Sequence, residues 1–249
     1  MLYLAIAVLV FVLSGVLAMA GLGAAFLFVP LFYWLGVPLP VAASTALLLN
    51  AVSLSFASVT YWRAGLVDLR LGVPITVTAV AAAPLGARLA PHVNTTVLLG
   101  LFAAFLLFAG AMMMFYRRPA TPRALTWRAE VGTGTGVGTL AGFLGGLLGV
   151  GGGNFILPVL NGLGMSAKVA AGTTGLAVVF SSLSGFLGRV STGGLDPVLV
   201  GVSVLAAAGG SLAGSRLMTS RISDARLKHL IAVLLWVIAV KIVLDLVTG

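Results

Sequence analysis

The chain has 249 residues, of which 60% are hydrophobic and only 8% are charged, and its mean hydropathy is +1.19. A soluble domain carries roughly a quarter charged residues, so this sequence lacks the polar surface that a water-soluble fold needs, and most soluble enzyme folds are excluded. The apolar runs are unbroken, whereas the strands of an outer-membrane barrel alternate in polarity. We therefore expect an all-α, polytopic helical membrane protein.

The charge balance and the absence of cysteine narrow the possible partners. The formal net charge is +9, but most of the 14 Lys and Arg residues lie between apolar segments, where such residues orient helices in a lipid bilayer. We expect no nucleic-acid partner, and the remaining positive potential favours anions. Without cysteine, disulfides and thiolate metal sites are excluded.

Ten apolar segments follow one another along the chain, and a helix that crosses a membrane needs roughly 20 apolar residues. The first five expected helices span 2–20, 24–36, 41–62, 71–90 and 95–116, and the next five span 131–148, 152–164, 167–190, 198–218 and 225–247. The first segment lacks a basic start and a clear cleavage site, so we expect a retained helix rather than a removed signal peptide. The second segment of each set is too short to cross comfortably. We therefore predict eight to ten spans in two repeats, 1–116 and 131–249, joined by a basic linker, 117–130.

The two sets of five segments arise from an internal duplication. A shift of 128 residues aligns 21–89 with 149–217 without a gap, and 18 of these 69 positions are identical. The identical pairs include Pro30 and Pro158, Asp68 and Asp196, and Arg88 and Arg216. Composition alone would match Ala, Leu and Val, but it would not also match proline, aspartate and arginine, so the repeat is real.

The distribution of Lys and Arg predicts that the two repeats are inverted. If the first two segments of each repeat return the chain to the side it came from, 11 of the 14 Lys and Arg residues lie on one side. Arg88, Arg189 and Lys241 then lie on the other side. Parallel repeats with one net crossing in the first pair would give 8 against 6. Because cytoplasmic loops are enriched in Lys and Arg, we expect inverted repeats, a cytoplasmic linker and both termini outside.

A glycine-rich turn separates the first and second segments of each repeat. One is Gly21-Leu22-Gly23, and the other is Gly149-Val150-Gly151-Gly152-Gly153, followed by Asn154. Irregular backbone at membrane depth is tolerated only when it is buried in protein or lines a wet cavity, and a helix that begins there directs its positive N-terminal end into that space. Two inverted copies would form an anion site from the glycines of both turns and Asn154. The alternative is close helix packing, which explains the four-residue spacing of the glycines between 134 and 146.

Hydroxyl groups on the third segment of each repeat are further candidate ligands. They can donate hydrogen bonds to an oxyanion without the cost of burying a charge. Within each segment, pairs of them are seven or eight residues apart and so lie near one helical face. The candidate donors are Thr45, Ser53, Thr173, Thr174 and Ser181. The alternative is hydrogen bonding between helices, a common use of Ser and Thr in membranes.

No residue pattern indicates catalysis, a metal or a cofactor. Five carboxylates occur, none in the middle of an apolar segment, so the acidic site of many proton- or sodium-coupled carriers is missing. There is no Ser-His-Asp set, HExxH or nucleotide signature, and we expect no enzyme. Arg88 and Arg216 end equivalent segments, where they either extend to the membrane surface or act as an anion gate.

The duplicated motif resembles that of a known family. Gly21-Leu22-Gly23 precedes Phe28-Val29-Pro30, the second turn precedes Leu157-Pro158, and each leads through a glycine and Val-Ala-Ala to a helix rich in Ser and Thr. This arrangement resembles the sulfite exporter TauE/SafE family of membrane permeases over nearly the whole chain. The resemblance implies transport of small sulfur-containing anions, such as sulfite, sulfonates or sulfoacetate, across a prokaryotic cytoplasmic membrane. The first half has Gly-Leu-Gly-Ala-Ala where the second has Gly-Val-Gly-Gly-Gly-Asn.

The residues and the resemblance together predict an anion permease whose midplane site lies between two inverted halves that rock against each other. Two alternatives remain. One is a passive anion channel, which the missing intramembrane carboxylate favours, and the other is a membrane scaffold or sensor, which would need only the packing glycines. The expected partners are a small anionic substrate and the lipid bilayer, and the sequence sets no oligomeric state.

Overall fold

The computed structural model describes residues 2–115, 126–189 and 197–248, and these residues form helices and connections without strands. The ten α-helices are α1 (Leu2–Met19), α2 (Ala25–Trp34), α3 (Leu39–Arg63), α4 (Leu69–Leu89), α5 (Thr95–Phe115), α6 (Trp127–Leu148), α7 (Gly153–Gly162), α8 (Ala167–Arg189), α9 (Pro197–Arg221) and α10 (Asp224–Thr248), with a short 3-10 helix at Ala90–His92. Every expected segment is a helix, so the all-α prediction is confirmed.

The largest difference from the predicted boundaries is at the start of α6; the others differ by at most three residues. α6 begins at Trp127, four residues before the expected start at 131. The charged residues Arg128 and Glu130 concealed the first turn, because apolar composition says nothing about a helix that extends beyond the apolar layer. Residues 116–125, which hold most of the expected linker, lie outside the described residues.

The duplication found in the sequence is present in the helices. α2 begins at Ala25 and α7 begins at Gly153, which are 128 positions apart. The starts of α3 and α8, and those of α4 and α9, have the same offset. We refer to positions 128 residues apart as equivalent.

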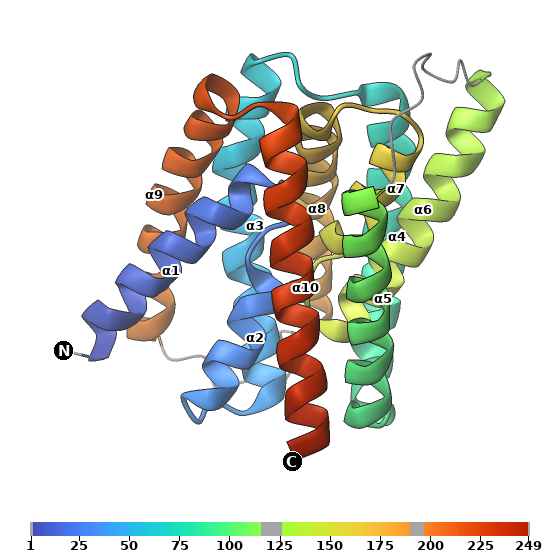
Figure 1. Cartoon of the computed structure of the whole chain (residues 1–249). Coiled ribbons are helices and arrows are strands. Elements are labelled where there is room, and N and C mark those ends of the chain that lie inside the picture. The colour runs from blue at the N-terminus through green and yellow to red at the C-terminus, as the bar shows by residue number, and fades with distance from the viewer. Residues whose placement is uncertain (1, 116–125, 190–196, 249) are drawn as a thin grey trace.

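The two repeats run in opposite directions (Figure 1). In this view α3 and α5 run upward, whereas their counterparts α8 and α10 run downward. α4 runs downward and α9 runs upward. The predicted inverted repeat is therefore confirmed, with a pseudo-two-fold axis in the plane of the expected membrane.

The first two helices of each repeat form a re-entrant hairpin. α1 enters the molecule and α2 returns toward the same end, and α6 and α7 do the same from the opposite end (Figure 1). α2 and α7 have 10 residues each, about 15 Å at 1.5 Å per residue, or half of the hydrocarbon layer. Within the described ranges, six helices (α3, α4, α6, α8, α9 and α10) are long and apolar enough to cross a membrane.

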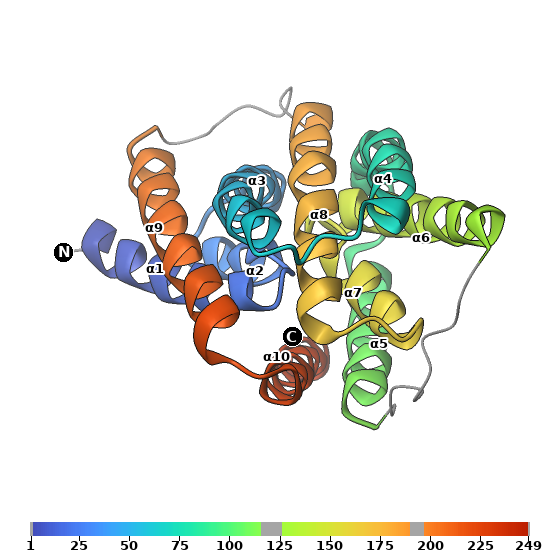
Figure 2. The same cartoon turned by 90° about the horizontal axis from the view of Figure 1, so that it is seen from above.

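Four packed helix pairs build the molecule around its centre. α3 lies beside α8 in the middle, α1 crosses α9 on one flank, α4 crosses α6 on the other, and α5 packs against α10 (Figure 2). Glycine makes the α4–α6 contact close: a Cβ added at Gly138, Gly142 or Gly146 would overlap the backbone of Ile75, Ala79 or Ala83, respectively. This row of glycines therefore serves helix packing.

Candidate functional site

The two glycine turns have matching backbone conformations. In the first turn (residues 21–23), Gly21 and Gly23 have φ values of +65° and +71°. In the second turn (residues 149–153), Gly149, Gly151 and Gly152 have values of +75°, +76° and +80°. Only glycine adopts this left-handed region at little cost, so the spacing of the glycines fixes the path of both turns.

Each turn packs against the central helix of the other repeat. A Cβ at Gly21 would overlap the carbonyl oxygen of Ala171 on α8, and one at Gly149 would lie 2.7 Å from the Cβ of Ala43 on α3. Ala43 and Ala171 are equivalent positions, so the two contacts are reciprocal. The absence of a side chain at Gly21 and at Gly149 is what allows the repeats to approach so closely at these two points.

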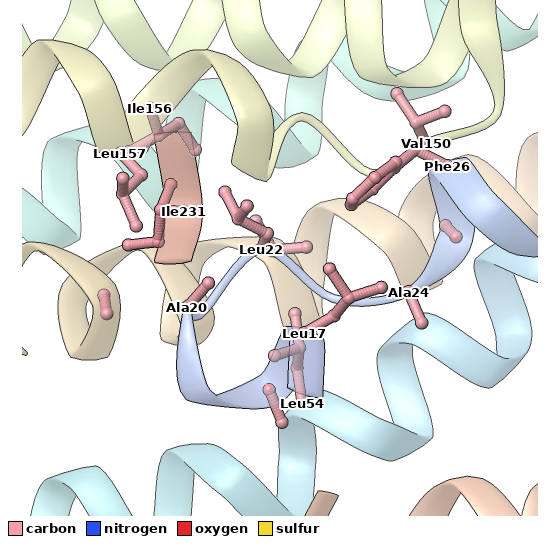
Figure 3. Close-up of a cluster of buried hydrophobic side chains, with 14 of the residues drawn as sticks. Leu17, Ala20, Leu22, Ala24, Phe26, Leu54, Val150, Ile156, Leu157 and Ile231 are labelled. Carbon is pink, nitrogen blue, oxygen red and sulfur yellow. The ribbon is translucent and has the colours of Figure 1, made fainter. Parts of the chain in front are cut away.

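The two turns also meet each other in the interior. A Cβ added at Gly153 would lie 2.7 Å from the carbonyl oxygen of Leu22, at the tip of the first turn. Figure 3 shows Leu22 and its equivalent Val150 within a buried apolar cluster that includes Phe26 and Ile231. Both turns therefore lie in the buried interior of the molecule.

Asn50 on α3 connects the turns, although the sequence analysis did not place it in the site. It is fully buried, its Oδ1 accepts a hydrogen bond from the backbone N–H of Ala25 (3.4 Å), and its Nδ2 donates to Ser182 Oγ (2.9 Å). A Cβ at Gly23 or at Gly151 would overlap or crowd its amide. The available signal was a single carboxamide within an apolar span, where such groups usually bond between helices.

Every predicted polar ligand is buried, but two of them have structural partners. The exposed fraction is at most 3% for Thr45, Ser53, Asn154, Thr173, Thr174 and Ser181. Ser181 Oγ donates to the carbonyl oxygen of Gly151 (2.9 Å) and so holds the second turn. Thr173 Oγ1 accepts from the backbone N–H of Asp68 (2.9 Å) and so holds the start of α4.

Three of the predicted ligands have buried polar atoms without a partner in the described part of the chain. They are both amide atoms of Asn154, the hydroxyl of Thr174 and the hydroxyl of Ser53. Buried polar atoms are nearly always hydrogen-bonded, and one left unpaired costs about 1–3 kcal/mol. Such atoms indicate a partner that is not protein, either water or a ligand.

The charge count placed Arg189 in a loop, but the structure shows that it is the last residue of α8. It is buried, and its Nη2 donates to the carbonyl oxygens of Gly146 (2.7 Å) and Leu147 (3.0 Å) in the last turn of α6. The error arose because α8 ends beside the deep end of α6, where a cation satisfies terminal carbonyls and the negative end of the helix dipole. At the equivalent position in the first repeat, the hydroxyl of Tyr61 donates to the carbonyl oxygen of Ala18, which is equivalent to Gly146.

The two proposed gate residues lie away from this buried cluster. Arg88 is exposed in the last turn of α4, and Arg216 is exposed near the end of α9. Neither side chain reaches the turns through a hydrogen bond among the described residues. The gate remains a prediction.

Two inverted repeats, each with a broken helix pair that meets its counterpart in the interior, form the architecture of a polytopic membrane transporter. The family model described as "Sulfite exporter TauE/SafE" matches residues 5–242, nearly the whole chain. The protein therefore belongs to the TauE/SafE family, a family of membrane transporters for sulfite and related sulfur anions. A comparison with curated proteins gave no match.

Proposed function

We propose that this protein moves small sulfur-containing anions, such as sulfite or organosulfonates, across a prokaryotic cytoplasmic membrane by alternating access. The observation that carries the proposal is Asn154, an amide in the first turn of α7 that is fully buried and has no hydrogen-bond partner among the described residues. A buried polar group without a hydrogen-bond partner lowers the stability of the fold, and a bound ligand or water would remove this cost.

The chemistry of the region suits an oxyanion. Backbone N–H groups at a helix start point away from the helix and carry partial positive charge, and the side-chain N–H2 of Asn154 adds neutral donors. The hydroxyls of Thr174 and Ser53 can donate as well. Neutral donors bind a transient anion without leaving an unpaired buried charge when the site is empty.

The arrangement of the repeats supports alternating access. At the turns, the two repeats touch through the reciprocal glycine contacts at Ala43 and Ala171. Elsewhere the packed pairs α1–α9, α3–α8, α4–α6 and α5–α10 each join a helix of one repeat to a helix of the other. Rocking these interlocked pairs against one another would open the meeting point of the turns to each side in turn. We assign the arginine-rich end of the molecule to the cytoplasm.

Transport by the purified protein in liposomes tests the proposal. Wild-type protein should move sulfite, and Asn154→Leu should reduce the initial rate by at least about tenfold, because the buried donor is lost. Asn161→Leu is the matched control, since Asn161 is a buried asparagine one heptad further along the same helix and donates to the carbonyl oxygen of Met165. Wild-type protein that moved neither sulfite nor any organosulfonate would overturn the proposal.

A passive anion channel is the second candidate, because the carboxylates in the described residues lie at helix ends. Asp68 is the N-cap of α4, and Glu130 lies in the first turn of α6. Asp245 lies near the end of α10, where it pairs with Lys241. A carrier shows accelerated exchange when substrate is present on both sides, whereas a channel does not, so counterflow separates the two. A scaffold or sensor would retain its role in Asn154→Leu.

A further inference from the structure

Three pairs of equivalent positions on the helices around the glycine turns differ in polarity. Asn154, at the start of α7, corresponds to Phe26 in α2. Thr174 on α8 corresponds to Ala46 on α3, and Asn50 on α3 corresponds to Val178 on α8. All six side chains are buried, so the differences change the chemistry of the interior and not of the surface.

In the first repeat, the protein itself satisfies the start of the helix. The backbone N–H of Ala25, the first residue of α2, donates to Asn50 Oδ1. The amide oxygen of Asn50 therefore takes the position at which an anion oxygen would accept a hydrogen bond. Phe26 beside it offers no donor, so the first turn of α2 itself carries no polar side chain, although the Ser53 hydroxyl on α3 is unpaired within the described residues.

In the second repeat, the equivalent helix start has no such acceptor. The N-cap of α7 is Gly152, and no side chain caps it. Val178, the counterpart of Asn50, lies against the turn with methyl groups about 3.1 Å from Cβ atoms added at Gly151 and Gly153. In place of an internal acceptor, the region has the unpaired amide of Asn154, whose side chain leans toward the N-terminus of α7, as helical side chains do.

The same helical face of α8 supplies the second unpaired group. Thr174 precedes Val178 by four residues, so the two side chains lie on one face, and Val178 contacts the second turn. The Thr174 hydroxyl is buried and has no partner within the described ranges. At the three pairs of positions compared above, the two unpaired groups, Asn154 and Thr174, both belong to the second repeat, whereas the unpaired hydroxyl of Ser53 belongs to the first.

We propose that the transporter has one anion subsite per chain, at the start of α7 with Asn154 and Thr174 as side-chain donors, and that Asn50 closes the equivalent site at the start of α2. The proposal rests on the proposed function for the class of ligand, small oxyanions. It goes beyond that function because the inverted repeats by themselves would predict two equivalent subsites. Asn50 acts as a built-in acceptor that makes the repeats functionally unequal.

Side-chain amide signals of asparagine report on the proposal directly. The chain has four asparagines, Asn50, Asn94, Asn154 and Asn161, so protein labelled with 15N-asparagine gives four side-chain amide signals in NMR, assigned through single variants at any three of these positions. Sodium sulfite, methanesulfonate, phosphate and acetate are titrated separately. We expect the Asn154 signal to shift saturably with at least one anion and to shift more than the Asn50 signal, because the amide of Asn50 lies near the second turn but is already hydrogen-bonded to Ser182 and Ala25. The Asn161 signal is the reference.

Exchanging equivalent residues between the repeats tests the closing role of Asn50. Asn154→Phe should weaken anion binding at least about tenfold, because the donor amide is lost, and Phe26→Asn alone should leave one anion bound per chain. Phe26→Asn combined with Asn50→Val should raise the stoichiometry to two, because the start of α2 then has both a free backbone donor and an amide. Size-exclusion chromatography and thermal unfolding identify variants that fail to fold. If the exchanged variants fail to fold, the comparison of the Asn154 and Asn50 signals in wild-type protein still tests the single-subsite proposal.

The possible outcomes separate this proposal from the proposed function. Sulfite transport with no response of Asn154 to any anion, or with equal responses of Asn50 and Asn154, would overturn the single-subsite proposal and leave the function intact. A response of Asn154 to phosphate or acetate without transport of any sulfur anion would overturn the function and support the subsite. No response to any of the four anions would overturn the subsite.

Discussion

Two buried asparagines show that the same side chain can serve folding or binding, depending on its partners. Asn50 hydrogen-bonds through both ends of its amide, to α2 and to α8. Asn154 is equally buried and has no partner in the described part of the chain. A satisfied buried amide stabilises a fold, whereas an unsatisfied one costs stability, so replacing the two residues should have opposite effects.

Leucine substitutions at these positions test that difference, because leucine and asparagine are similar in size. Asn154→Leu should raise the free energy of unfolding by up to about 2 kcal/mol, since it removes an unpaired polar group. Asn50→Leu should lower it by about 1–3 kcal/mol, since Ala25 and Ser182 lose their partner. Thermal unfolding in detergent without added anions measures both. Similar destabilisation in both variants would show that Asn154 is a structural residue.

Arg189 and Tyr61 perform the same task with different chemistry, since each donates to carbonyl oxygens in the last turn of the first helix of its own repeat. Arg189→Leu should lower the free energy of unfolding by about 1.5–3 kcal/mol, because α6 loses a charged donor. Arg189→Tyr should recover part of that loss, because tyrosine serves at the equivalent position. The melting temperatures of the two variants measure the difference, and equal values would contradict the assignment.

The sequence alone could not predict the roles of Asn50 and Arg189, because their hydrogen-bond partners are distant along the chain. The partners of Asn50 lie 25 and 132 positions away, and those of Arg189 lie more than 40 positions away. No local pattern predicts which distant backbone group a side chain will meet. Asn154 could be placed because it adjoins a glycine turn whose backbone exposes donors regardless of tertiary detail.

At the scale of single helices, α6 contains both glycines that pack closely against another helix and glycines that do not. Gly142 lies against Ala79, where an added Cβ would overlap backbone, whereas Gly136 on the same helix has nothing within 4 Å. Gly142→Ala should lower the free energy of unfolding by about 1–3 kcal/mol, because α4 and α6 must move apart. Gly136→Ala, the matched control, should raise it by up to about 1 kcal/mol through helix propensity. Thermal unfolding distinguishes them, and a neutral Gly142→Ala would contradict the packing role.

Helices were predicted well because the signals that define them are local. A run of apolar residues and its length suffice to recognise a crossing helix or a short re-entrant one, and all ten segments were found. The role of a hydroxyl within such a helix is not local. Thr173 and Thr174 are adjacent and equally buried, yet the first holds the start of α4 and the second has no partner among the residues that the structure describes.

At the scale of the whole molecule, the inverted arrangement was predictable because it depends on a sum over many charges. Moving Arg189 from the loops to the interior removes one cation from the expected outer side and so strengthens the asymmetry. α3 and α9 end, and α4, α6, α8 and α10 begin, at the upper end in Figure 1. The parts of the helices nearest that end contain Arg63, Arg70, Arg128, Lys168, Arg216, Arg221 and Arg226. Arg88 is in the last turn of α4 and Lys241 is in the C-terminal half of α10, and both helices run to the lower end. The error in one residue therefore left the topology unaffected.

The orientation in the membrane follows from this asymmetry and can be measured in cells. Because the chain contains no cysteine, a thiol reagent labels only a cysteine that is introduced by substitution. The chain without any introduced cysteine is the control. His92 ends the short 3-10 helix that follows α4, which runs to the lower end in Figure 1, and Ser220 is in the last turn of α9, which runs to the upper end. Both residues are exposed. We expect a membrane-impermeant maleimide to label His92→Cys in intact cells and Ser220→Cys only after the cells are opened, because the arginine-rich end faces the cytoplasm. The reverse pattern would place the termini inside and reverse the assignment of the two sides, whereas labelling of both residues in intact cells would contradict a membrane-spanning arrangement between them.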